Sequence, residues 1–136
     1  MQMKLPKISL VLATFTILLL IMNVAWAQED TTPKKRLRSP ATVKGFIGGE
    51  SHDSYVVRVR KGQVMTVQIS WKRESDNHAS FTVSESPNFF TGELITFGKE
   101  SDDGKRWTGK SPKTSEYYIY VVAHPTAQYT LRVKVT

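Results

Sequence analysis

The sequence predicts an all-β protein, an antiparallel, jelly-roll-like β-sandwich of about seven or eight strands. Three observations support this fold class. Apolar and polar residues alternate in short runs, turn signals rich in glycine, proline and aspartate separate the runs, and no segment shows the spacing of an amphipathic helix. Strands of this kind, with turns roughly every 8 to 12 residues, are typical of sandwiches and jelly rolls.

The sandwich is expected to follow a signal peptide formed by residues 1–27. Lys4 and Lys7 supply positive charge at the start, "ISLVLATFTILLLIM" is an apolar core, and "AWA" before Gln28 is a small-x-small cleavage site. An uncleaved membrane anchor is the alternative, because the apolar stretch approaches the length that spans a bilayer. The cleavage signature favours removal, so we expect a periplasmic or secreted protein with no stable membrane span.

Residues 28–40 are predicted to be a basic, disordered linker. They lack apolar periodicity, contain Pro33 and Pro40, and carry the cationic cluster "KKRLR". Two roles are open to this arm, contact with anionic envelope polymers or lipid head groups and that of a solvated tether, and we favour the tether. The β-sandwich domain is then expected over residues 41–136, where the absence of cysteine leaves burial of an apolar core as the source of stability.

The first strands of the domain follow from this alternation. "ATVKGFIG" predicts a short strand that ends at Gly48-Gly49, and "SYVVRVR" and "QVMTVQISW" predict the next two. Lys61-Gly62 lies between these two strands, and because glycine tolerates positive φ we expect an antiparallel hairpin there. The side chains expected to face the core from this pair are Tyr55, Val57, Val59, Met65, Val67 and Ile69.

The second half of the domain continues the pattern. "ASFTVSE" predicts a strand with Phe81 and Val83 inside, and "ELITFG" predicts a weaker one before the Asp-Gly turn of "SDDGKRW". The final two runs, joined by "HPTA", predict a hairpin in the core, where full burial of each large aliphatic side chain contributes roughly 1.5 to 3 kcal/mol. Its inward side chains are expected to be Tyr117, Ile119, Val121, Tyr129, Leu131, Val133 and Val135.

The sequence predicts no enzyme, no metal site and no cofactor. His52, His78 and His124 fall in three separate predicted loops without the spacing of zinc ligands, and no Gly-x-Ser-x-Gly motif is present. Acidic residues in "ESDDG" and "ESD" are an alternative as calcium ligands, but "DDG" is itself a turn signature. The formal net charge of +7 belongs partly to the first 40 residues, so the domain is only mildly basic and nucleic acid is not expected as a partner.

Aromatic side chains favour binding over catalysis. Tyr118 and Tyr120 are expected to face outward near outward arginine and lysine residues, a composition typical of interface hot spots that cross-strand packing also explains. A module that binds carbohydrate would use aromatic rings as platforms. The candidates for such a site are Trp71, Trp107, Tyr118 and Tyr120. For the two tryptophans, the alternative is a lid over one open end of the sandwich.

Two long segments resemble a known family. "VKGFIGGESHDSYVVRVRKGQVMTVQIS" and "RWTGKSPKTSEYYIYVVAHPTAQYTLRVKV" are similar to the periplasmic inhibitors of goose-type (g-type) lysozyme and, more widely, to bacterial pre-peptidase C-terminal (PPC) domains. The resemblance covers nearly all of residues 42–136. It implies a β-sandwich that blocks a lysozyme by placing loops in its substrate cleft, without catalytic residues. The residues that carry it are mainly fold anchors: Gly45, Ile47, Tyr55, Lys61, Gly62, Gln63, Trp107, Gly109, Pro112, Tyr117, Ile119, Val121, Tyr129, Thr130 and Leu131.

The resemblance implies that two loops bind the partner. Their residues are Glu50, Ser51, His52, Asp53, His124, Pro125, Thr126, Ala127 and Gln128. The second loop, residues 123–128, is shorter than in such inhibitors and carries no arginine. We therefore expect an exported, non-enzymatic protein that blocks a g-type lysozyme through these loops, and a module that binds carbohydrate or a cell-envelope polymer is the alternative. The inhibitor hypothesis requires the two loops to lie side by side at one end of the sandwich.

Overall fold

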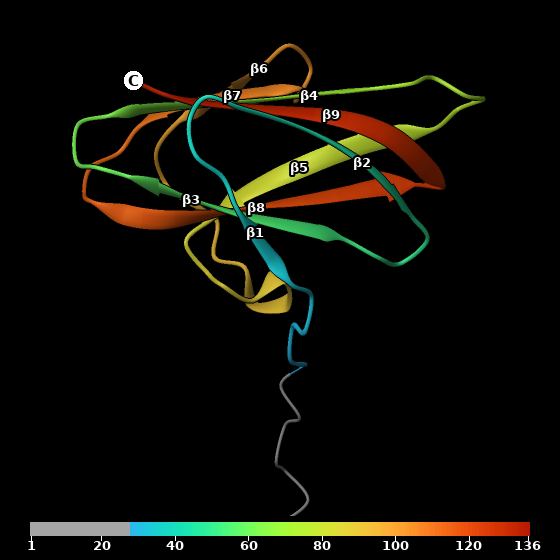
Figure 1. Cartoon of the computed structure of the whole chain (residues 1–136), viewed down its shortest axis with the longest axis horizontal. Coiled ribbons are helices and arrows are strands. Elements are labelled where there is room, and N and C mark those ends of the chain that lie inside the picture. The colour runs from blue at the N-terminus through green and yellow to red at the C-terminus, as the bar shows by residue number, and fades with distance from the viewer. Residues whose placement is uncertain (1–27) are drawn as a thin grey trace, which may run out of the picture.

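A computed structural model describes residues 28–136, and the predicted signal peptide lies outside the described residues. Two β-sheets pack face to face (Figure 1). The four-stranded sheet has the order β1 (Lys34–Arg36), β3 (Asp53–Val59), β8 (Ser115–His124) and β5 (His78–Ser84). The five-stranded sheet has the order β2 (Ala41–Gly48), β9 (Thr126–Val135), β4 (Val64–Trp71), β7 (Arg106–Lys110) and β6 (Lys99–Ser101).

The predicted β-sandwich is therefore confirmed, with three strands, β1, β6 and β7, that the sequence did not predict. All strand pairs are antiparallel except β1 with β3, which is parallel. The helical content of residues 28–136 is one turn of 3₁₀ helix, η1 (Phe89–Thr91). No helix in this range has the length and apolarity needed to cross a membrane.

The core lies between the sheets and is filled by the alternate residues that the sequence predicted. Successive side chains on a strand point to opposite faces of the sheet, so every second side chain of each strand packs against the other sheet. Phe81 and Val135 are partly buried at the margin of this core. The side chains that are fully buried include Val59, Val67, Tyr117, Ile119, Val121 and Leu131.

The two predicted hairpins are wrong. β3 pairs with β1 and β8, whereas β4 pairs with β7 and β9, so the Lys61-Gly62 turn carries the chain from one sheet to the other. Gly62 has the expected positive φ of 86°. β8 and β9 likewise lie in opposite sheets, joined at Pro125. Alternation shows which face of a strand is buried, but the same pattern suits pairing with any neighbour, and a tight turn can connect two sheets as well as two paired strands.

The predicted disordered linker is also wrong over part of residues 28–40. Lys34–Arg36 forms β1, which extends the four-stranded sheet beside β3. The Leu37 amide donates a hydrogen bond to the carbonyl oxygen of Val56 at 2.8 Å, and the Leu37 side chain is buried in the core. The edge of β3 offers unpaired backbone groups, and a segment without periodicity of its own gains both hydrogen bonds and burial by adding to it.

The weak strand predicted over "ELITFG" is replaced by a loop. Only Leu94 makes a β-bridge, to Ser84, and its side chain is 80% exposed. Phe97 packs edge-on against Trp107 and Tyr117 with ring centroids 5.7 and 5.6 Å away. This aromatic packing, rather than a ladder of backbone hydrogen bonds, holds the segment against the sandwich.

Candidate functional site

Three loops meet at one end of the sandwich, on the right of Figure 1. They are the β2–β3 loop (49–52), the β4–β5 loop (72–77) and the β8–β9 turn (124–126), and together we call them the loop end. The Gly49 amide donates to the carbonyl oxygen of Pro125 at 3.0 Å. The two loops in which partner-binding residues were predicted therefore lie side by side, as the inhibitor hypothesis requires.

Sequence reasoning missed the β4–β5 loop, which Asn77 ties to the β8–β9 turn. The Asn77 side-chain amide donates to the carbonyl oxygens of Thr126 at 3.2 Å and Lys72 at 2.9 Å, and its side-chain oxygen accepts from the Glu74 amide at 3.0 Å. The segment "KRESDN" signals a turn by its composition. Its place beside the other two loops depends on β4 pairing with β9, which no local signal indicates.

Six of the nine predicted partner-binding residues are exposed on or beside the loop end. Ala127 is only 2% exposed and faces the core from β9, and Asp53 is partly buried. His52 is also buried, with 8% exposure. These three are corrections, because burial leaves their side chains little or no surface for a partner. The exposed residues are Glu50, Ser51, His124, Pro125, Thr126 and Gln128.

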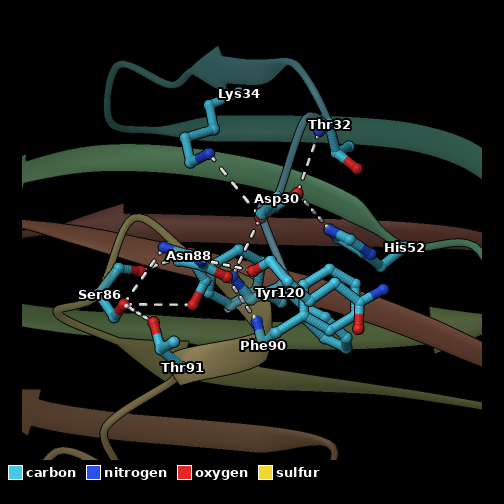
Figure 2. A network of polar contacts seen from close by, with 11 residues as sticks. Asp30, Thr32, Lys34, His52, Ser86, Asn88, Phe90, Thr91 and Tyr120 are labelled. Carbon is cyan, nitrogen blue, oxygen red and sulfur yellow. Dashed lines mark hydrogen bonds and ion pairs between the residues drawn. The ribbon is translucent and has the colours of Figure 1, made fainter. Parts of the chain in front are cut away.

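His52 pairs with a buried carboxylate from the arm (Figure 2). The side chains of His52 and Asp30 are 6% and 1% exposed, and His52 Nε2 lies 3.1 Å from Asp30 Oδ1. Asp30 also accepts hydrogen bonds from the backbone amides of Phe89 and Thr32, both at 3.0 Å, and lies 3.8 Å from Lys34 Nζ. His52 thus holds the arm on the domain.

The pKa of Asp30 reflects this environment. Burial acts to raise it, but the hydrogen bonds from Phe89 and Thr32 and the electrostatic attraction of His52 and Lys34 outweigh burial, so the pKa lies below its ordinary value. The ionised carboxylate is the form that these donors stabilise. The His52 ring stacks on Phe89 with centroids 4.1 Å apart, which adds packing to the same cluster.

A second buried network supports the loop end from beneath. The Tyr129 hydroxyl donates to the Asp53 carboxylate and shares a hydrogen bond with the Tyr55 hydroxyl. Burial raises the pKa of Tyr129, and the Asp53 carboxylate raises it further because that partner favours the protonated phenol. Gly45 is required beside this network, since a Cβ there would lie 2.5 Å from the Tyr129 hydroxyl oxygen. The network fixes the start of β3 against β9.

The four residues of the predicted carbohydrate site do not form one platform. Trp107 is 6% exposed beneath Phe97, which agrees with a packing role. Tyr120 is 2% exposed, because the loop that carries η1 covers it and the Ser86 carbonyl oxygen accepts its hydroxyl hydrogen. Tyr118 is half-buried on β8 in the four-stranded sheet, whereas Trp71 lies at the end of β4 in the other. The site proposed from their side-chain type is thus not assembled.

Trp71 instead borders an open groove next to the loop end. The groove has a volume of about 520 Å³ and runs over β2, β9 and β4. Phe46 stands in its wall, 65% exposed, on the outward side of β2. Sequence reasoning missed Phe46, although an aromatic residue at an outward position of "ATVKGFIG" was a signal. An exposed aromatic residue beside polar loops is the usual composition of an interface hot spot.

No group of three or more His, Cys, Asp or Glu residues within 28–136 lies close enough together to hold a metal ion. The acidic side chains considered as calcium ligands lie in different loops, with Glu74 at the loop end and Asp102 and Asp103 in the β6–β7 turn. At the loop end, exposed polar side chains surround the exposed aromatic ring of Phe46, and this arrangement is suited to contact with a partner.

Comparison with known proteins finds similar folds. Aeromonas hydrophila PliG, a periplasmic lysozyme inhibitor of g-type lysozyme, has a TM-score of 0.60 and 23% identity, with 76% of this chain and 96% of that chain covered. The PPC domain of a Bacillus anthracis collagenase has a TM-score of 0.57 and 20% identity over 79% and 100%. Salmonella Typhimurium PliG has a TM-score of 0.52 and 17% identity over 78% and 100%. The fold is similar to both groups.

This likeness confirms the resemblance drawn from the sequence, as a shared fold. Comparison of the sequence with protein-family models and with curated proteins gives no match. The solved structures named PliG are periplasmic inhibitors of g-type lysozyme, and what this chain shares with them is the fold. The residues that contact a partner follow from the geometry of this chain alone.

Proposed function

We propose that this protein is an exported, non-enzymatic binding protein whose loop end occupies the substrate cleft of a g-type lysozyme. The observation that carries the proposal is the convergence of three loops at one end of a sandwich whose fold is similar to PliG. Export follows from the predicted signal peptide and places the protein in a periplasm or outside the cell.

The loop end is suited to this role because its backbone is held before a partner arrives. The Gly49–Pro125 hydrogen bond and the bonds of Asn77 connect all three loops, so few backbone conformations remain to be lost on binding. Steric occupation of a cleft needs no bond making or breaking, which agrees with the lack of a predicted catalytic site. Contacts come from the six exposed residues named above, with Phe46 as apolar anchor.

The competing function, a module that binds carbohydrate through Trp71, Trp107, Tyr118 and Tyr120, is not favoured. Two of these rings are buried, and the other two lie on different sheets. Sugar platforms need ring faces open to the ligand. A polymer would have to use another surface of the molecule.

Inhibition of a purified g-type lysozyme on cell walls tests the proposal. We expect residues 28–136 to slow lysis at close to one-to-one ratio, and Phe46→Ala to weaken inhibition roughly tenfold or more, since removal of an aromatic hot spot commonly costs 2 kcal/mol or more. Leu94→Ala is the matched control: it removes an exposed apolar side chain near Ser84, at the opposite end of β5 from His78. Unchanged lysis in the presence of excess wild-type protein excludes a g-type lysozyme as the partner. Equal inhibition by the two variants excludes the loop end with its groove as the contact surface.

A further inference from the structure

The outer face of the five-stranded sheet carries positive charge only. Residues directly opposite in an antiparallel pair share one side of the sheet, so the outward positions follow from the register. Six cations occupy such positions, and the other outward residues are uncharged, mostly threonine, serine and glutamine. The one carboxylate on these strands, Glu100, pairs with inward Trp107 and therefore points to the other side. The cations are Lys44, Lys99, Arg106, Lys110, Arg132 and Lys134.

The cations stand in rows across the strands, separated by hydrogen-bonding side chains. Arg132 and Arg106 lie on either side of Gln68, which is opposite both in the register. Strands are about 4.8 Å apart, so the backbones that carry the two arginines are about 10 Å apart. A second row places Lys134 and Lys99 at either end of the adjacent Thr66 and Thr108. A groove of about 410 Å³ runs over this area.

These six cationic side chains have no carboxylate partner within residues 28–136. None of them takes part in the ion pairs within residues 28–136, which use other lysine and arginine residues. Like charges on one face repel one another and oppose folding. Protection of a sheet edge is not the reason for Arg132 and Lys134, because β9 is an interior strand paired on both sides. An anionic ligand would compensate these charges.

We propose that the part of this face around Arg106, Arg132 and Lys134 binds a linear, carboxylate-bearing polysaccharide, independently of the loop end. Lys44 lies apart from this area, in the groove beside Phe46. Arginine holds carboxylates with two parallel hydrogen bonds, and the threonine and glutamine side chains between the cations match sugar hydroxyl groups. The groove is lined by Thr42, Thr66, Gln68, Arg106, Arg132 and Lys134 among others and contains no aromatic ring, so it offers no stacking for bases of single-stranded nucleic acid. Its apolar lining residues, Pro40, Ala41 and Val133, are small, so the groove offers no large apolar side chain that would enter a membrane.

Binding of residues 28–136 to polygalacturonate, measured by titration calorimetry at low salt, tests this proposal. We expect saturable binding that weakens steeply as sodium chloride is added. The double variant Arg106→Gln and Arg132→Gln should bind at least tenfold more weakly and show a shallower salt dependence. The control Arg58→Gln and Arg60→Gln removes the same charge from exposed positions near β3, in the other sheet, and should bind within about twofold of wild type.

Four results would overturn the proposal: no binding of polygalacturonate by the wild-type protein, equal losses in the two double variants, equally tight binding of neutral dextran, or tighter binding of single-stranded DNA or of vesicles rich in anionic lipid. Equal losses would mean that net charge alone attracts the polymer. Lysozyme inhibition by the Arg106 and Arg132 variant should remain unchanged, so failure of this proposal is distinguishable from failure of the proposed function. Circular dichroism confirms that each variant is folded.

Discussion

Replacing Asp30 by alanine tests whether the arm belongs to the folded domain. The side chain is 1% exposed and accepts hydrogen bonds from the amides of Phe89 and Thr32 while pairing with His52. A hydrogen bond to a charged group contributes about 1.5 to 3 kcal/mol, and loss of the carboxylate removes two such bonds together with the contacts to His52 and Lys34. Release of the arm lets water reach the freed amides and limits the loss, so we expect the free energy of unfolding to fall by about 3 kcal/mol.

The measurement is urea denaturation near pH 7 followed by tryptophan fluorescence, together with the thermal midpoint. A loss of about 3 kcal/mol corresponds to a midpoint roughly 12 °C lower for a domain of this size. Lys34→Ala is the matched control, because its 3.8 Å ion pair with Asp30 is partly exposed and is expected to contribute less than about 1 kcal/mol. If both variants unfold within 1 kcal/mol of the wild type, the arm is a tether and the network does not stabilise the fold.

The pH dependence gives the same test a second measurement. The folded state holds the pKa of Asp30 below its ordinary value, so ionisation of this group contributes stability above the unfolded pKa, near 4. That contribution is lost as pH falls through the lower folded pKa. The stability difference between wild type and Asp30→Ala should therefore be constant above about pH 5 and shrink in acid. A difference that persists unchanged to pH 2 contradicts the assignment.

Two further predictions concern the buried tyrosines. Tyr129→Phe removes the hydroxyl that links Asp53 to Tyr55 and should lower the unfolding free energy by about 1 to 3 kcal/mol in the same denaturation assay. The control is Tyr118→Phe, because the Tyr118 hydroxyl makes no hydrogen bond within residues 28–136. This control should change the unfolding free energy by less than about 0.5 kcal/mol. Burial raises the pKa of Tyr55, Tyr120 and Tyr129 in the folded protein, so the free energy of unfolding should fall as pH rises above about 10. Ultraviolet titration should show these phenols ionising only as the protein unfolds. Reversible ionisation of every tyrosine below pH 11 in the folded protein would refute this.

The local alternation of apolar and polar residues was sufficient to predict the fold class and which side chains of each strand face the core. The alternation around Tyr55, Val67 and Ile119 placed these residues in the core, where the structure has them. It was insufficient for the pairing, because β3 and β4 look like a hairpin in sequence and lie in opposite sheets. Pairing is decided by which edges are free after the sheets pack, and that is a property of the whole chain.

The contacts of the arm and of the loop end also could not be predicted from local sequence patterns. Asp30 and His52 are 22 positions apart and carry no motif, and Asn77 meets Thr126 from 49 positions away. Phe46 and the basic rows were visible in part as outward residues on predicted strands. Their common surface needed the register of β2, β9, β4 and β7.

The sequence by itself determined that this chain alternates apolar and polar residues at the spacing of strands and contains the glycines that its turns and close contacts need, because such signals act over a few residues. The tertiary structure decided which strands became neighbours, how residues 30–37 joined the four-stranded sheet, which predicted contact residues became buried, and that cations gathered on one face. These features depend on segments far apart in the chain competing for the same edges and the same core, and only the complete packed arrangement sets the outcome of that competition.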